Sequence, residues 1–143
     1  MTEPPASAII AAHQVRTVFG RLRRRLREVA NLGDLTPSQT SVLSRLAKDG
    51  PATASTLAAL ERIRPQSMAA LVAAIAGRGL IARTPDPADG RRQRISLTEA
   101  GQELIEGYRR EREEWLATEL AHNFTEDDRQ TIIAAMALLD RLA

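Results

Sequence analysis

The sequence predicts a mainly α-helical protein with a small β-hairpin: a winged helix-turn-helix flanked by N- and C-terminal dimerisation helices. Three observations lead to this prediction. Apolar residues recur three and four positions apart through most of the 143 residues. Two short helical segments fill residues 53–78. An apolar strand, a turn rich in proline, aspartate and glycine, and a basic strand follow over 80–97. A basic hairpin beside such a helix pair is suited to gripping the backbone of duplex DNA.

The first three helices follow from periodicity and capping. A long amphipathic helix, with an apolar stripe from Ile9 to Val29, is expected to end at residues 31–34. The segment Thr36–Gln39 opens a second helix, because threonine can cap it, proline suits its first position and glutamine can complete a capping box. Gly50-Pro51 ends that helix, and Thr53 can cap a short third one.

A fourth helix over residues 64–78 is the expected recognition helix. Proline occupies its early turn, and the expected buried stripe is Met68, Leu71, Val72 and Ile75. Its remaining faces carry small or polar side chains, so the helix can approach another surface closely. A strand at 80–84 follows. In the returning strand Ile95 and Leu97 alternate with basic and polar residues, which predicts one core-facing side and one side with guanidinium groups.

Two further helices complete the chain. Thr98 can cap a long one, and Thr125 can cap a last one whose apolar stripe ends at Leu142. The first and last two helices have more apolar surface than a small helix-turn-helix core can cover. A symmetric homodimer with interlocked terminal helices would bury it, and a monomeric bundle is the alternative. We expect one folding unit, with dimerisation helices at 1–35 and 98–143 around a DNA-binding lobe at 36–97.

Charge is distributed unevenly along the chain. Residues 1–97 hold 15 basic and 7 acidic side chains, a net +8, and residues 98–143 hold 5 and 11, a net −6. This asymmetry favours one surface that faces a polyanion, although solvated helix faces would give the same counts. The basic run Arg21–Arg27 has three readings: it flanks DNA, pairs with acidic terminal helices, or neutralises its own surroundings.

Other kinds of chemistry find little support. The chain has no cysteine, which excludes disulfides and thiolate sites, and its two histidines, His13 and His122, are far apart in sequence. No catalytic cluster or glycine-rich phosphate cradle is visible, so we expect neither an enzyme nor a cofactor or metal. The N-terminus does not resemble a signal peptide, and no apolar run approaches the roughly 18 residues of a membrane span. We expect a cytoplasmic protein.

Three short motifs carry a family resemblance. Residues 79–83 read Gly-Leu-Ile-Ala-Arg, residues 89–91 read Asp-Gly-Arg, and residues 97–101 read Leu-Thr-Glu-Ala-Gly. They resemble the Gly-Leu-Val-x-Arg, Asp-x-Arg and Leu-Thr-x-x-Gly that begin, turn and leave the wing in the MarR (multiple antibiotic resistance regulator) family of winged-helix transcription factors. Their separations, and the order and length of all elements, extend the resemblance over essentially the whole chain.

The resemblance implies which residues meet double-stranded DNA. Arg91 matches the family's wing arginine and would enter the minor groove or its phosphate rim, with Asp89 orienting it through a salt bridge. The recognition helix would lie in the major groove, where Gln66 and Ser67 can read base edges and Arg64 can reach guanine or phosphate. The remaining implied contacts are to phosphates, by Arg62, Arg83, Arg92 and Arg94.

The recognition helix also departs from the family pattern. One turn into this helix the family commonly has a hydroxyl and then a long polar residue, where this chain has Ala69 and Ala70. We therefore expect fewer polar base contacts and more readout through thymine methyl groups or DNA shape. For each phosphate-contacting arginine an ordinary solvated face is the alternative, and for Asp89-Gly90 a plain hairpin turn.

The resemblance further implies an effector site. Family members commonly bind small aromatic or lipophilic ligands, which release DNA, in a crevice between the dimerisation helices and the DNA-binding lobe. Here the crevice would be lined by Phe19, Leu22, Val42, Leu46, Tyr108 and Trp115. Plain core is the more common role of such a stripe. The predicted function is a homodimeric transcriptional regulator, most simply a repressor at a pseudo-palindromic operator. The alternative is a winged-helix interaction module that holds an acidic partner.

Overall fold

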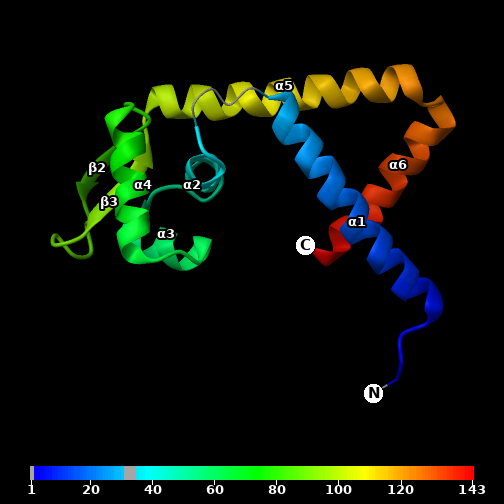
Figure 1. The fold of residues 1–143 in the computed structure, drawn as a ribbon, viewed down its shortest axis with the longest axis horizontal. Coiled ribbons are helices and arrows are strands. Elements are labelled where there is room, and N and C mark those ends of the chain that lie inside the picture. Colours follow the sequence, from blue (N-terminus) through cyan, green and yellow to red (C-terminus); the bar gives the residue numbers. More distant parts are fainter. Residues whose placement is uncertain (1, 31–34) are drawn as a thin grey trace. The chain divides into compact units, whose positions relative to one another are not determined.

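The protein is described here by a computed structural model that covers residues 2–30 and 35–143 (Figure 1). Its elements are α1 (Ala6–Val29), α2 (Pro37–Asp49), β1 (Ala52–Thr53), α3 (Ala54–Glu61), α4 (Pro65–Gly77), β2 (Ile81–Pro85), β3 (Gln93–Leu97), α5 (Glu99–Asn123), α6 (Glu126–Leu139) and the 3₁₀ helix η1 (Asp140–Leu142). The predicted fold class is confirmed. The predicted end of the first helix at residues 31–34 lies outside the described residues.

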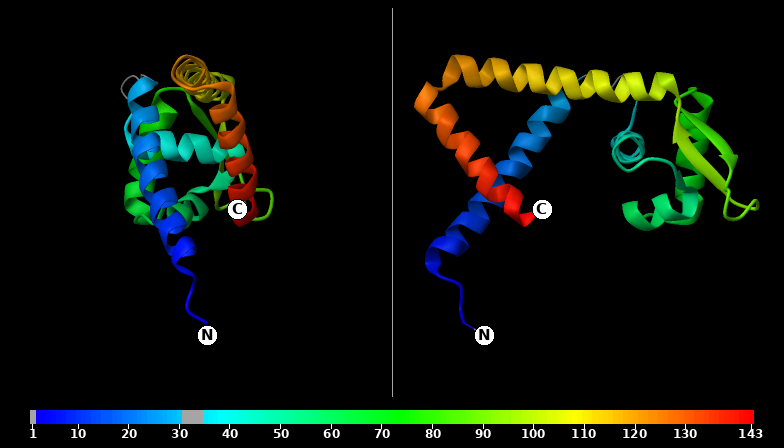
Figure 2. Two further views of the ribbon diagram at one scale, coloured as in Figure 1. Left: turned by 90° about the vertical axis from the view of Figure 1, so that its right-hand side faces the viewer. Right: turned by 180° about the vertical axis from the view of Figure 1, so that it is seen from behind.

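The chain divides into two compact units. One consists of Met1–Ala30 together with Arg110–Ala143, and the other is Asn31–Arg109. The second unit holds the helix-turn-helix and the wing. Figures 1 and 2 show its β2–β3 hairpin beside α4, with the connecting loop projecting from the unit.

The unit Asn31–Arg109 contains a three-stranded antiparallel sheet in the order β1-β3-β2. Strands β2 and β3 form the predicted hairpin, with Ile81 opposite Leu97. Strand β1 adds to the predicted elements: Ala52 lies opposite Ile95, and Thr53 lies opposite Arg94. Because Thr53 is also the N-cap of α3, this short strand ties the start of the helix-turn-helix to the wing.

The helices and sheet of this unit share one apolar core. Its largest fully buried side chains come from α2, α3, α4 and β3: Val42, Leu43, Leu57, Met68, Ile75 and Ile95. Burial of a side chain of this size contributes about 1.5–3 kcal/mol. The predicted stripe of α4 is confirmed at Met68, Val72 and Ile75, whereas Leu71 is half-buried.

Threonine hydroxyls begin three helices of this unit, as predicted. Thr36 and Gln39 form a capping box, with N–H···O distances of 3.2 and 3.0 Å. The Thr53 hydroxyl accepts a hydrogen bond from the first turn of α3. The Thr98 hydroxyl accepts from the Gly101 N–H at 3.1 Å and donates to the Gly79 carbonyl at 2.6 Å. A cap of this kind stabilises by about 1 kcal/mol.

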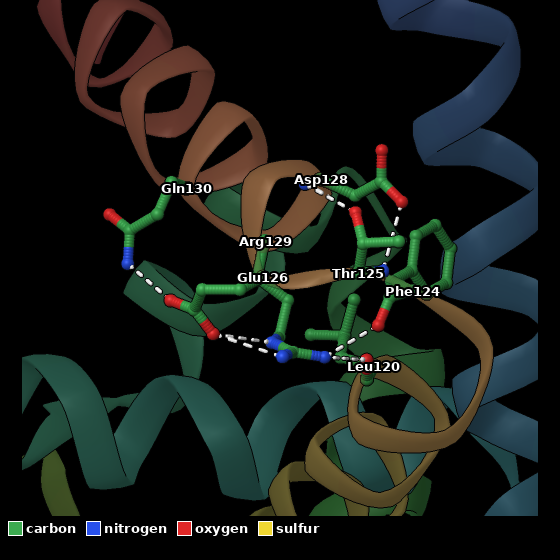
Figure 3. A network of polar contacts seen from close by, with 7 residues as sticks. All are labelled: Leu120, Phe124, Thr125, Glu126, Asp128, Arg129 and Gln130. Carbon is green, nitrogen blue, oxygen red and sulfur yellow. Dashed lines mark hydrogen bonds and ion pairs between the residues drawn. The ribbon is translucent and has the colours of Figure 1, made fainter.

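In the other unit, Arg129 braces the corner between α5 and α6 (Figure 3). Its Nη1 donates to the carbonyl oxygens of Leu120 at 3.1 Å and Phe124 at 2.6 Å. Its Nε and Nη2 donate to Glu126 Oε2 at 3.1 and 2.9 Å. Helix α6 itself begins with a capping box at Thr125, the cap that the sequence predicts. The guanidinium therefore satisfies carbonyl groups that the end of α5 leaves free.

The helices α1 and α6 bury none of their residues. Large exposed apolar side chains lie on them and on the segment that follows α6: Ile9, Ile10, Val18, Phe19, Ile133, Met136, Leu138 and Leu142. Between α1 and α5, the Arg25 guanidinium lies 5.4 Å from the centre of the Trp115 ring. A stacked cation of this kind is worth about 0.5–1 kcal/mol at an exposed site. It covers only the Trp115 ring, and the large apolar side chains named above stay exposed.

Candidate nucleic-acid interface

The recognition helix α4 is introduced by a tight turn after α3. Arg62 ends α3 in the left-handed conformation, with φ 55° and ψ 43°. Arg64 is the N-cap of α4, and Pro65 is its first residue, which confirms the predicted place of proline. Gln66 and Ser67 follow in the first turn and are exposed. The first turn of this helix therefore presents an amide and a hydroxyl to the surroundings, together with N–H groups that favour an anionic partner.

The rest of the exposed face of α4 is lined by alanine. Its exposed residues after the first turn are Ala69, Ala70, Ala73, Ala74 and the final Gly77, while Met68, Val72 and Ile75 are buried. A face of methyl groups allows close approach to a groove. It offers van der Waals contact, and no hydrogen bonds, to base edges.

The wing loop is held by its own backbone and by two aspartates. The Asp86 N–H donates to the Arg92 carbonyl at 2.8 Å, and the Arg92 N–H donates to the Asp89 carbonyl at 3.0 Å. Asp89 Oδ1 accepts from the Arg91 backbone N–H at 3.1 Å. Asp89 Oδ2 lies 3.9 Å from Arg92 Nε. The expected salt bridge between Asp89 and Arg91 is therefore wrong: Asp89 shapes the turn through the Arg91 backbone and pairs with the next arginine, which leaves the Arg91 guanidinium available.

A hollow of about 470 Å³ lies between the start of α3, helix α4 and the wing. Three of the predicted DNA contacts line it: Arg83 from β2, and Arg91 and Arg92 from the wing. Thr53 and Ser55 contribute hydroxyl groups from the start of α3. The floor is apolar and includes Ala54, Ala69, Val72 and Ile95. Three guanidinium groups, two hydroxyls and a helix N-terminus around one hollow are the donor set that a phosphate group prefers.

The comparisons with known proteins agree with this geometry. The sequence model of the MarR family matches residues 35–92. An HTH-type transcriptional regulator of Mycobacterium tuberculosis is 44% identical over 101 residues, which make up 71% of each protein. This chain belongs to the MarR family. A Pseudomonas aeruginosa protein of known structure is similar over 97% of both chains, with 36% identity and a TM-score of 0.84.

A MarR family protein from Bacillus stearothermophilus shares the fold, with a TM-score of 0.77 and 24% identity over 98% of this chain and 97% of that one. The MarR resemblance predicted from three short motifs is therefore confirmed. All nine predicted DNA contacts of this MarR-family chain are exposed, as contact with DNA requires.

Arg94 stands apart from the other wing arginines. Strand β3 alternates its side chains, and Ile95 is buried against the core. Arg94 therefore lies on the opposite face of the sheet, where its cross-strand neighbours are Thr53 and Thr84. Arg83, opposite Ile95 in the register, shares the face that borders the hollow. Strand β3 thus keeps the predicted alternation, with Ile95 in the core and Arg94 exposed on the other side.

Three polar residues that line the hollow are absent from the predicted DNA contacts: Thr53, Ser55 and Gln93. The sequence predicts Thr53 only as a helix cap, and it singles out neither Ser55 nor Gln93. The Thr53 hydroxyl lies 3.2 Å from the Ser55 hydroxyl and 2.9 Å from that of Thr56. The signal was present in the sequence, since hydroxyl residues at a helix start next to a basic hairpin predict an anion site. The sequence contains no signal that predicts β1, the strand that brings Thr53 to the wing.

A polar network behind the interface joins α2 to α3. Glu61 accepts from Arg45 Nε at 2.7 Å and from the Ser41 hydroxyl at 2.8 Å. Arg45 also lies 3.7 Å from Asp49. Burial of the Glu61 side chain, which is 16% exposed, raises its pKa. The hydrogen bonds from Arg45 and Ser41 and the charge of Arg45 outweigh that effect, so the pKa lies below its ordinary value of 4.5.

The residues of the predicted effector crevice divide between the two units. Phe19, Leu22 and Trp115 belong to the first, and Val42, Leu46 and Tyr108 to the second. The last three are buried, and Val42 also lines a small hollow of about 190 Å³ between α2, the end of α3 and α4. The crevice stays a prediction.

Among the described residues no helix is long and apolar enough to cross a membrane, and no cluster of three metal-ligating side chains is present.

Proposed function

We propose that this MarR-family chain is a sequence-specific regulator of transcription that binds double-stranded DNA as a homodimer and acts as a repressor. The observation that supports it most is the hollow between α4 and the wing, with Arg83, Arg91 and Arg92 around it. A DNA-binding role without catalysis agrees with the Mycobacterium tuberculosis relative, which is an HTH-type transcriptional regulator. Such a protein acts in the cytoplasm.

The hollow has a specific place in the proposed complex. Helix α4 enters the major groove, and the wing reaches the adjacent minor groove. The DNA strand that separates two adjacent grooves must then pass between α4 and the wing, which is where the hollow lies. We assign to it one or two backbone phosphates of that strand, held by the three arginines and by the hydroxyls of Thr53 and Ser55. These contacts position the protein without reading sequence.

Sequence is read by the first turn of α4. Gln66 and Ser67 are exposed there and carry the donors and acceptors that base edges recognise. The alanine face that follows favours close apolar contact, so DNA shape and thymine methyl groups supply the rest of the preference. Arg64 can reach guanine or phosphate at the helix start, and Arg94 contacts the backbone outside the hollow.

Two copies complete the binding unit. The exposed apolar faces of α1 and α6 need a covering surface, and a second copy supplies the same faces by symmetry. The basic run Arg21–Arg27 on α1 and the acidic start of α6 complement each other in charge. A homodimer would meet two half-sites about one helical turn apart, or a multiple of it. A small aromatic or lipophilic effector would release DNA.

The experiment is a salt titration of DNA binding with matched variants. Arg91→Ala should weaken binding to all sequences and lower the salt slope by about 1, because one phosphate contact and its released counterion are lost. Gln66→Ala should leave the salt slope unchanged and change the preferred bases. A good base contact is worth about 1–3 kcal/mol of discrimination against the wrong base. Arg110→Ala, which removes an exposed arginine outside the interface, is the control and should change neither.

Equal salt slopes for Arg91→Ala and Arg110→Ala would contradict the assigned role of the wing. A wild-type protein that binds duplex DNA with no preference for any sequence over competitor DNA would contradict the regulator itself, and would favour an interaction module with an acidic partner.

A further inference from the structure

The helix α3 ends in a motif that normally uses glycine. The Ile63 N–H donates to the Ala58 carbonyl at 3.1 Å, and the Arg62 N–H donates to the Ala59 carbonyl at 3.3 Å. This pair of bonds is a Schellman motif, whose second-last residue takes a left-handed conformation. In α3 that residue is Arg62, at φ 55°.

The helix α4 ends in the same motif, with glycine in the same place. The Leu80 N–H donates to the Ile75 carbonyl at 3.2 Å, and the Gly79 N–H donates to the Ala76 carbonyl at 3.0 Å. Gly79 has φ 73°. The two helices of the helix-turn-helix thus form an internal comparison: one motif, with glycine in one case and arginine in the other.

Arg62 is the only non-glycine residue with positive φ in the described part of the chain. A side chain with a Cβ is strained in this region, because Cβ approaches the neighbouring carbonyl oxygen. Within the described residues, the Arg62 side chain is exposed and forms no ion pair that could offset this strain. Strained residues concentrate where a function requires them.

We propose that the left-handed turn carries arginine because its guanidinium binds a backbone phosphate beside the N-terminus of α4, so that this residue lowers the stability of the free protein and raises its affinity for DNA. This proposal rests on the proposed function. It defines a phosphate contact separate from the hollow, since Arg62 is not among the residues that line the hollow. It also places a fixed cation two residues before Arg64, the N-cap of the recognition helix.

The test compares thermal unfolding with binding to a short duplex of random sequence, at one protein concentration. Arg62→Gly should raise Tm by about 2–4 °C, because relief of the strain outweighs the added freedom of the unfolded chain. The same variant should bind the duplex about fivefold more weakly, with a salt slope lower by about 1. A stabilised protein that binds less well is not expected from a residue with a purely structural role.

Two variants provide controls. Arg62→Lys keeps both the charge and the strained Cβ, so it should keep the wild-type Tm and salt slope. Gly79→Ala adds a Cβ at the matching position of α4 and should lower Tm.

If Arg62→Gly left the salt slope unchanged, the proposed phosphate contact of Arg62 would be wrong. If it did not raise Tm, the proposed backbone strain at Arg62 would be wrong. If the wild-type protein bound no duplex at all, the proposed function would fail and the phosphate contact with it. The Tm values of the wild-type protein and Arg62→Gly would still show whether Arg62 strains the backbone.

Discussion

At the scale of single residues, Gly101 shows why one short motif recurs where the chain leaves the wing. A Cβ at this position would overlap the backbone carbonyl oxygen of Leu80. That same oxygen accepts a hydrogen bond from the Thr98 N–H at 3.1 Å. The start of α5 therefore packs directly on the backbone that leads into β2, and only glycine allows the approach. The sequence identified this position by resemblance, while the structure supplies the steric reason.

Gly101→Ala should destabilise the protein by about 1–3 kcal/mol, since α5 and the start of β2 must separate to admit a methyl group. Gly107→Ala is the matched control in the same helix, because no heavy atom outside its own neighbourhood lies within 4 Å of the added Cβ. It should stabilise by about 0.5–1 kcal/mol through helix propensity. Urea denaturation of both variants measures the difference. Two variants of equal stability would contradict the close contact at Gly101.

At the scale of elements, the sequence predicts the features that depend on neighbouring residues. It does not predict the features that depend on contacts between residues distant in the chain. The caps at Thr36, Thr53, Thr98 and Thr125 each rest on residues within three or four positions, so the sequence carries the whole pattern. Strand β1 has two residues, too few for an alternating pattern. Its pairing with β3 depends on a tertiary contact, as does the hollow that Thr53 and Ser55 help to form.

The bond between α2 and α3 was missed for the same reason, because Arg45 and Glu61 are 16 residues apart. We expect Glu61→Gln to lower stability by about 1–2 kcal/mol at neutral pH, since it breaks a charge-assisted hydrogen bond in a mostly buried position. The folded state lowers the pKa of Glu61. This stabilisation is therefore present above the ordinary value of 4.5 and is lost as pH falls through the lower folded value.

Chemical denaturation at several pH values checks this prediction. The wild-type protein and Glu61→Gln should differ at neutral pH and converge in acid. Asp49→Asn is the control: Asp49 pairs with the same arginine but is 53% exposed, so its loss should matter by less than about 0.5 kcal/mol. A constant difference between wild type and Glu61→Gln across the whole pH range would show that packing, and not the ionised pair, joins the two helices.

At the scale of the whole molecule, the remaining question is what covers the apolar faces of α1 and α6. Ile133 on α6 is 60% exposed, and Phe19 on α1 is 42% exposed. Isolated exposed apolar residues are common, but seven on α1 and α6 and an eighth just after α6 are a pattern typical of an interface. If a second copy covers them, Tm should rise with protein concentration, since association stabilises only the folded chain.

A charged residue in that face should separate association from folding of the DNA-binding lobe. Ile133→Glu should give a single-chain species in sedimentation equilibrium, because a carboxylate would be buried without a partner in the dimer. DNA affinity should fall steeply, as two linked half-sites bind far more tightly than one. Leu60→Glu is the matched control: Leu60 is 50% exposed but lies on α3 in the other unit, so it should leave the dimer intact. If Ile133→Glu remained dimeric, α6 would lie outside the interface, and the apolar face of α1 would have to form it.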